Sequence, residues 1–199
     1  MKLRVLFVAV VITASAVSAG QSQLPKSQLP ELGRPTKETD EVPLFNFEQY
    51  FPGKWKFEWE APEGIFGTGG RITGTTVYKV IDNKFFEAET EATGPDGPFK
   101  TKELIAYHRD NKVVSRYVTD SRGFSYMQIG RIGGDLGGYF SIYYESSPFT
   151  YKGKSVRVRS TTRLLSPVSY RVQTTVSVDG GPFMNYATPI WQKEISTAK

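Results

Sequence analysis

Residues 169–178 read Ser-Tyr-Arg-Val-Gln-Thr-Thr-Val-Ser-Val, with mainly apolar side chains at every second position. Successive side chains of a β-strand point to opposite faces, so Tyr170 and Val172 would face a core while Arg171 faces water. The same period of two recurs along most of the chain after residue 44, for example at 55–59, 86–92 and 156–159. The pattern predicts strands that are buried on one face.

Clusters of Gly, Pro, Asn and Asp separate these runs and favour tight hairpin turns. Together the runs and turns predict about ten strands, near residues 54–60, 68–80, 84–93, 99–108, 112–119, 123–131, 138–146, 154–164, 168–178 and 183–193. Short connections favour an all-β, antiparallel, up-and-down meander, and closing it into a barrel removes the exposed edges. A two-sheet sandwich is the alternative. Residues 45–51 could form a short helix or plug leading into the first strand.

Composition excludes several kinds of chemistry. The 199 residues include no cysteine and one histidine. Disulfides, thiolate catalysis and Cys-based metal sites are therefore excluded, and one chain cannot build a three-His zinc site. The formal net charge is +5, and it falls to +3 without Lys2 and Arg4 of the N-terminal segment, which is too small to indicate a nucleic-acid partner. We expect no metal site and no catalytic residue that the sequence alone could identify.

The N-terminus predicts export. Lys2 and Arg4 precede an apolar run at 5–12, and Val17-Ser18-Ala19 fits a cleavage site before Gly20, so residues 1–19 resemble a signal peptide. The apolar run is shorter than the about 20 residues that span a bilayer, although an uncleaved anchor is the alternative. We expect a secreted or periplasmic protein without a transmembrane anchor after processing.

Residues 20–43 have the composition of a disordered linker. They contain Ser-Gln-Leu-Pro twice and no aromatic side chain, so they cannot bury enough apolar surface to fold. A motif that docks a partner is the other interpretation of this segment. We place the folded domain at 44–199.

Several short motifs resemble those of a known family. Gly53-Lys54-Trp55 resembles the Gly-x-Trp signature that opens calycin barrels, and further likeness lies at 80–85, 105–108, 178–183 and 191–193. The ordered set resembles a bacterial family of lipocalin-like domains of uncharacterised function, related to the nitrobindin and fatty-acid-binding barrels. The resemblance implies a ten-stranded barrel, often secreted, with no established common reaction.

Three residues are candidates for the floor of such a barrel. Trp55, at the start of the first strand, would plug the floor against Trp191 of the last strand, with Gly53 beside it.

The single histidine departs from the nitrobindin pattern. Nitrobindin-like barrels hold haem through a histidine near the C-terminal end, whereas His108 lies at the end of a central strand, beside a turn. We therefore predict no cofactor and do not expect haem. His108 fits a solvated residue that caps the turn. In an alternative reading it would serve a barrel isomerase or lyase as an acid–base group together with inward tyrosines.

Tyrosines in the predicted strands suggest a ligand cavity. Tyrosine combines an apolar ring with a hydroxyl group, and a ten-stranded barrel leaves interior space, so a small and mainly hydrophobic ligand is expected in the lumen. The protein would act as a carrier or sensor. The candidate ligand-binding residues are Tyr107, Tyr117, Tyr126, Gln128, Tyr143, Tyr170 and Thr174.

Arginines on two predicted neighbouring strands leave one more function open. Facing inward, they could bind a carboxylate or phosphate, and facing outward they would form a solvated stripe. Such a stripe, or the linker, could dock an envelope partner onto a filled barrel. A protein-interaction module is therefore an alternative to the carrier or sensor and to the isomerase or lyase. Their alternation with valines favours the outward direction without deciding it; the residues are Arg157, Arg159, Arg163 and Arg171.

Overall fold

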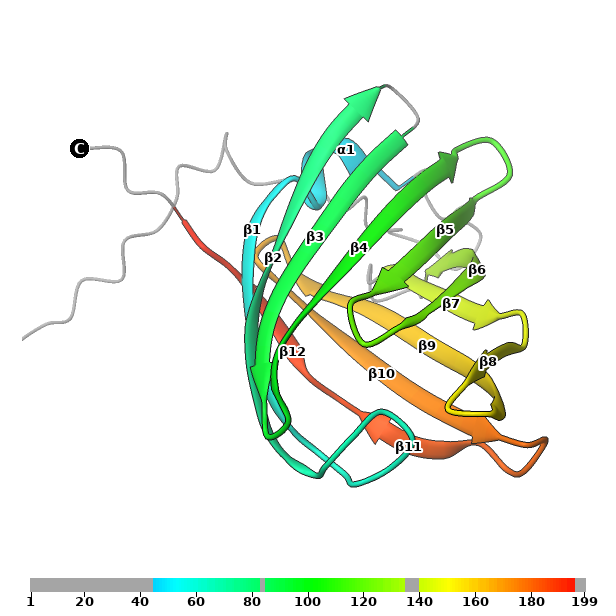
Figure 1. The fold of residues 1–199 in the computed structure, drawn as a ribbon. Coiled ribbons are helices and arrows are strands. Elements are labelled where there is room, and N and C mark those ends of the chain that lie inside the picture. The colour runs from blue at the N-terminus through cyan, green and yellow to red at the C-terminus, as the bar shows by residue number, and fades with distance from the viewer. Residues whose placement is uncertain (1–44, 83–84, 135–139, 196–199) are drawn as a thin grey trace, which may run out of the picture.

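The computed structural model describes residues 45–82, 85–134 and 140–195. The signal peptide and linker predicted at 1–43 lie outside these residues. The described chain forms one short helix and a set of antiparallel strands (Figure 1). Their bounds are α1 Phe47–Tyr50, β1 Gly53–Ala61, β2 Gly70–Asp82, β3 Phe85–Gly94, β4 Gly97–His108, β5 Val113–Asp120, β6 Phe124–Gly134, β7 Phe140–Ser146, β8 Phe149–Tyr151, β9 Lys154–Ser166, β10 Ser169–Val178, β11 Met184–Ala187 and β12 Ile190–Lys193.

Ten of the strands form a closed ring. Strands β1 to β7 pair in chain order, β7 pairs with β9, and β9 pairs with β10. The final strand, β12, pairs with both β10 and β1 and so closes the barrel. This confirms the antiparallel meander barrel and excludes the sandwich.

The structure differs from the predicted strands in two places. The run expected at 183–193 is two strands, because it is interrupted at Thr188-Pro189. Proline has no N–H to donate to a ladder, and the Pro189 carbonyl instead accepts from the Val172 N–H at 3.0 Å. The short strand β8, which pairs with β9, was not expected.

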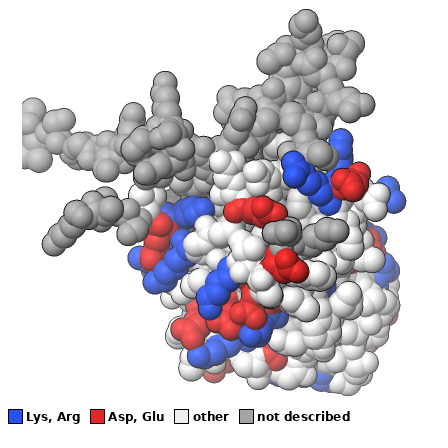
Figure 2. Space-filling model, turned by 90° about the horizontal axis from the view of Figure 1, so that it is seen from above, with Lys and Arg blue, Asp and Glu red and all other residues white. Residues whose placement is uncertain are grey.

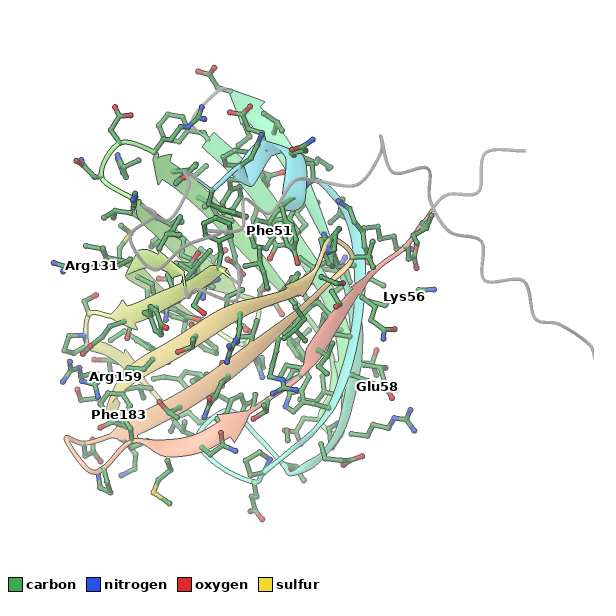
Figure 3. All side chains as sticks on the ribbon, turned by 180° about the vertical axis from the view of Figure 1, so that it is seen from behind. Phe51, Lys56, Glu58, Arg131, Arg159 and Phe183 are labelled. Atoms are coloured by element: carbon green, nitrogen blue, oxygen red, sulfur yellow. The ribbon has the colours of Figure 1, made fainter. Side chains whose placement is uncertain are left out.

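Alternate side chains along the strands point into and away from the barrel, as the sequence predicts. In β1, Trp55 and Phe57 are buried, whereas Lys56 and Glu58 point away from the barrel (Figure 3). Acidic and basic side chains on the outer face form exposed pairs, such as Lys102 with Glu89 at 3.2 Å. Seen from above, basic and acidic side chains are interspersed (Figure 2). The described side chains visible in this view therefore form no large field of one sign.

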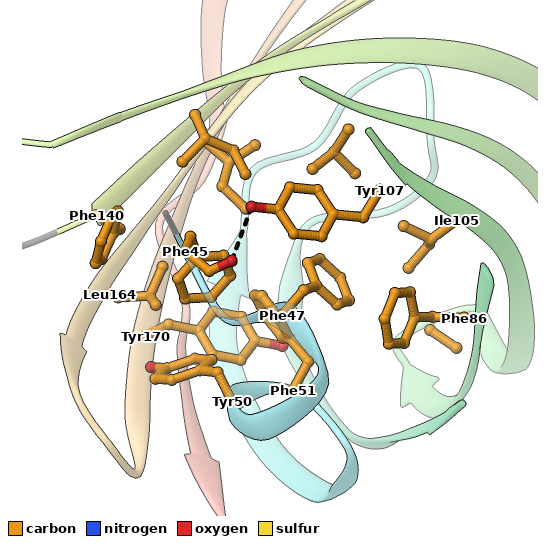
Figure 4. Packing of buried hydrophobic residues seen from close by; sticks show 14 of the residues in the cluster. Phe45, Phe47, Tyr50, Phe51, Phe86, Ile105, Tyr107, Phe140, Leu164 and Tyr170 are labelled. Carbon is orange, nitrogen blue, oxygen red and sulfur yellow. Dashed lines mark hydrogen bonds between the residues drawn. The ribbon is translucent and has the colours of Figure 1, made fainter. Parts of the chain in front are cut away.

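The helix α1 covers one end of the barrel. The Asn46 side chain caps it by accepting from the Gln49 N–H at 3.0 Å, as an N-cap residue typically does. Phe47 and Tyr50 then point into a cluster of buried rings from the strands (Figure 4). The Tyr107 hydroxyl donates to the Phe45 carbonyl at 2.7 Å and fixes the segment that leads into the helix.

The opposite end is covered by the segment that joins β1 to β2. Its Phe66 is buried and packs against Phe124, Tyr151 and Tyr186, with ring centroids 5.1–6.1 Å apart. Side chains therefore pack over both ends of the lumen.

Candidate functional site

A cavity of about 200 Å³ lies in the lumen between the two covered ends. Aromatic rings form much of its wall, and threonines and four charged side chains supply polar atoms. The aromatic residues that line it are Phe47, Phe51, Phe57, Trp59, Phe66, Tyr78, Phe99, Phe124, Tyr126, Tyr144, Tyr170, Tyr186 and Trp191. A mainly apolar wall with a few convergent polar groups is typical of a small-molecule site.

A buried ion pair forms the polar centre of this cavity. Arg116 of β5 donates from Nη1 to Glu103 Oε2 of β4 at 3.0 Å, and each side chain is 15% exposed. Burial alone lowers the pKa of a guanidinium, but here the nearby Glu103 carboxylate outweighs that effect and the pKa of Arg116 stands above its usual value. Arg116 is therefore cationic inside the barrel.

Neighbouring strands hold the Arg116 guanidinium in place. Its Nε donates to Gln128 Oε1 at 2.8 Å and its Nη2 donates to Ser160 Oγ at 3.3 Å. The same group lies over the Tyr144 ring, 4.1 Å from the centroid, where a cation is attracted to the ring face. These contacts fix the guanidinium with its carboxylate beside it.

A second ion pair lies toward the Phe66 end. Arg122 donates from Nη2 to Asp120 Oδ2 at 2.7 Å and from Nε to Asp120 Oδ1 at 2.9 Å, a two-point contact. The Asp120 side chain is almost fully buried, and Arg122 also lies 4.0 Å over the Phe99 ring. Arg122 therefore joins the cavity wall to the end that Phe66 covers.

Tyrosine hydroxyls complete the polar part of the wall. Tyr78 and Tyr170 are hydrogen-bonded through their hydroxyls at 3.2 Å. Burial raises the pKa of both, and it raises the pKa values of Tyr126 and Tyr144 to about 12. All four are therefore neutral phenols at physiological pH and can donate or accept hydrogen bonds.

We expect these tyrosines to make the fold sensitive to alkali. Tyrosine in an unfolded chain has a pKa near 10, and the folded values are higher, so the stabilisation is complete below about pH 10 and is lost as the pH rises toward about 12. Denaturant unfolding at a series of pH values, with tyrosinate absorbance as a second signal, measures this. The double variant Tyr126→Phe/Tyr144→Phe should show a shallower decline, and an equal decline would contradict the assignment.

The candidate ligand-binding residues that lie inside the barrel separate into three groups. Tyr126, Tyr170 and Thr174 line the cavity. Gln128 is also inside the barrel, where it holds Arg116. Tyr107 is buried among the rings at the α1 end, apart from the cavity wall.

Tyr117 and Tyr143 lie outside the barrel, contrary to the expectation. They are 43% and 57% exposed, because their strands turn the adjacent Val118 and Ile142 inward. Neighbouring residues of a strand face opposite ways. A ligand in the lumen cannot contact these two tyrosines.

The three residues expected at the barrel floor do not lie together at one end of the barrel. Gly53 begins β1 with φ +120°, which favours glycine. Trp55 is fully buried at the α1 end, where its Nε1 donates to the Phe51 carbonyl at 2.7 Å. Trp191 stacks on Tyr170 at 5.3 Å and lines the cavity, so it is a wall residue and not the partner of Trp55.

The remaining candidates point away from the lumen. His108 is exposed and lies 3.4 Å from Ser115 Oγ, outside the cavity. Arg157 and Arg159 form ion pairs with Glu145 on the outer face, and Arg159 lies 4.0 Å over the Phe183 ring (Figure 3). Arg163 and Arg171 are exposed as well. The arginine stripe therefore faces solvent.

The sequence reasoning missed Glu103 and Arg116. A signal for them exists, because Arg116 lies in the same phase of its strand as Val114 and Val118, and Glu103 lies in the same phase as Ile105. Opposite charges in the apolar phase of two consecutive strands indicate a pair inside a barrel.

Within residues 45–82, 85–134 and 140–195, no helix is long and apolar enough to cross a membrane. Over the same ranges, no three His, Cys, Asp or Glu side chains gather as metal ligands would.

Comparison with known proteins supports the fold alone. No protein-family model and no curated protein match the sequence. The crystal structure of Rv2717c from M. tuberculosis matches with a TM-score of 0.61 and 12% identity, over 73% of this chain and 93% of that one. A de novo designed fluorescence-activating β-barrel matches with a TM-score of 0.42 and 18% identity, over 73% of this chain and 95% of that one. The first likeness agrees with the closed antiparallel barrel.

Proposed function

We propose that this protein binds a small, mainly hydrophobic ligand inside its barrel and acts as a carrier or sensor. The observation that carries the proposal is the aromatic-walled cavity of about 200 Å³, which persists although both barrel ends are covered. Protein interiors otherwise pack to the density of organic crystals, so space of this size at polar anchors indicates a site. The resemblance of the sequence to lipocalin-like domains adds support.

Two alternatives are less well supported by the geometry. A barrel isomerase or lyase using His108 needs that imidazole in the cavity, but His108 is exposed outside it. An interaction module with a filled barrel needs a lumen without free space, and the cavity argues against that.

The residues do not fit a haem group. Among the described residues, no His, Cys or Met side chain lines the cavity, and these are common axial ligands. The lining tyrosines keep their protons because burial raises their pKa values. A cavity of about 150 Å³ holds benzene, and a porphyrin is several times larger. We therefore propose a ligand site without a cofactor.

Native mass spectrometry of the full-length gene product, purified gently from its natural source, tests the proposal. We expect a discrete small-molecule adduct that is lost in Thr101→Phe, because Thr101 lines the cavity. The matched control is Thr119→Phe on the adjacent strand, where Thr119 is exposed on the outer face. An adduct that survives Thr101→Phe, or a bare protein in repeated preparations, would overturn ligand binding in the lumen.

We also propose that the chain is exported after removal of residues 1–19. The basic, apolar and small-residue segments of the N-terminus support this. The same spectra test it, because the mass of the bare protein should correspond to residues 20–199. A mass that retains the first 19 residues would contradict cleavage at this site.

A further inference from the structure

We propose that the cavity selects an uncharged ligand, about the size of one substituted aromatic ring, that carries a group able both to accept and to donate a hydrogen bond. This inference rests on the proposed function and adds the chemical class of the ligand. It follows from the charge balance, the polar atoms and the volume of the lumen.

The charges that line the cavity cancel. Among the described lining residues, the charged ones are Glu103, Arg116, Asp120 and Arg122. Each arginine holds one carboxylate, at 3.0 Å for Arg116 with Glu103 and at 2.7 Å for Arg122 with Asp120. The lumen therefore offers no net charge to a ligand.

Two effects oppose the binding of an anionic ligand in such a site. The ligand must lose its hydration on entering the barrel, and Glu103 repels it at the place where Arg116 would attract it. A lone buried arginine would favour a carboxylate, but here the guanidinium already has one. A neutral ligand avoids both the large cost of lost hydration and the repulsion by Glu103.

The ion pair nevertheless suits a neutral polar group. Guanidinium N–H donors and a carboxylate acceptor lie side by side at Arg116 and Glu103. A hydroxyl or primary amide can accept from the first and donate to the second.

The volume limits the ligand to about one ring with a short substituent. Benzene occupies an engineered cavity of about 150 Å³, and this cavity has about 200 Å³. The aromatic wall favours a flat ring through stacked or edge contacts. A long acyl chain does not fit this volume.

Phenylacetamide and phenylacetate are matched probes, because they have the same shape and differ by one charge at neutral pH. We expect ligand-observed NMR titration of the full-length protein to show phenylacetamide binding about tenfold more tightly than phenylacetate, or better. Equal or tighter binding of phenylacetate, or no binding of phenylacetamide, would overturn the inference. If the natural adduct is still lost in Thr101→Phe, the proposed function survives that result.

The variant Glu103→Gln tests the cause of the preference. It frees the charge of Arg116, so the ratio of the two affinities should shift toward phenylacetate by about tenfold. Glu89→Gln is the control, since Glu89 lies on the outer face of β3 and pairs with Lys102, and its ratio should stay at the wild-type value. If Glu103→Gln does not fold, Asp120→Asn removes the other cavity carboxylate and should produce the same shift. An unchanged ratio in a folded variant would refute the charge-balance argument.

Discussion

Replacing Trp55 by alanine is expected to lower the free energy of unfolding by about 3–5 kcal/mol, the range for a fully buried tryptophan. Trp55 is 0% exposed and packs against Tyr50 and Tyr170, with centroids 5.6 and 4.7 Å away. The substitution opens a cavity beneath α1. It also leaves the buried Phe51 carbonyl without the indole N–H that it accepts at 2.7 Å.

Denaturant unfolding followed by circular dichroism measures this loss. The control is Tyr143→Ala, which removes a large aromatic side chain from the outer face, where it is 57% exposed. We expect it to change stability by less than about 0.5 kcal/mol. If Trp55→Ala lost no more than the control, Trp55 would not be anchoring the α1 end.

Removing Glu103 is expected to be the second most damaging change. Glu103→Leu leaves the guanidinium of Arg116 inside the barrel without its carboxylate, and breaking a buried pair in this way costs on the order of 3 kcal/mol. Gln128 and Ser160 would still accept hydrogen bonds from Arg116, but they carry no charge. Equilibrium unfolding of the single variant measures the effect.

The double variant Glu103→Leu/Arg116→Met separates loss of the pair from loss of packing. It replaces both charges with apolar groups, so we expect it to recover most of the stability. Glu89→Leu is the exposed control and should change stability by less than about 0.5 kcal/mol, because the Glu89 side chain is 46% exposed and its pairs are solvated. A double variant as unstable as Glu103→Leu would show that the charge balance is not the cause.

The strands and their closure were predictable because alternation along one strand is a local property. Val156 and Val158 alternate with Arg157 and Arg159, and the structure turns the valines inward. The break at Thr188-Pro189 was not predicted, because the residues on both sides of it keep strand character. The closed barrel itself could be predicted from the number of alternating runs and the shortness of their connections.

The site was harder to predict because it depends on which face of each strand is buried and on the register between neighbouring strands. In β5, Val113 and Tyr117 stand on one face and Val114 and Val118 on the other, so hydrophobicity alone does not decide which face is buried. Glu103 pairs in register with Val118, which places it diagonally from Arg116. The turn between β4 and β5 sets that register, and long side chains then bridge the diagonal.

Closure through β12 also governs how this chain reaches its folded state. The ring is complete only when Trp55–Glu58 pair with Ile190–Lys193, two segments far apart in the sequence. Pairing of such distant segments is slow, because the entropy of closing the intervening loop opposes it. Until β12 docks, β1 and β10 both present open edges to other chains. The lifetime of this open sheet, and not the final stability of the barrel, therefore determines how exposed the newly made protein is to aggregation and proteolysis.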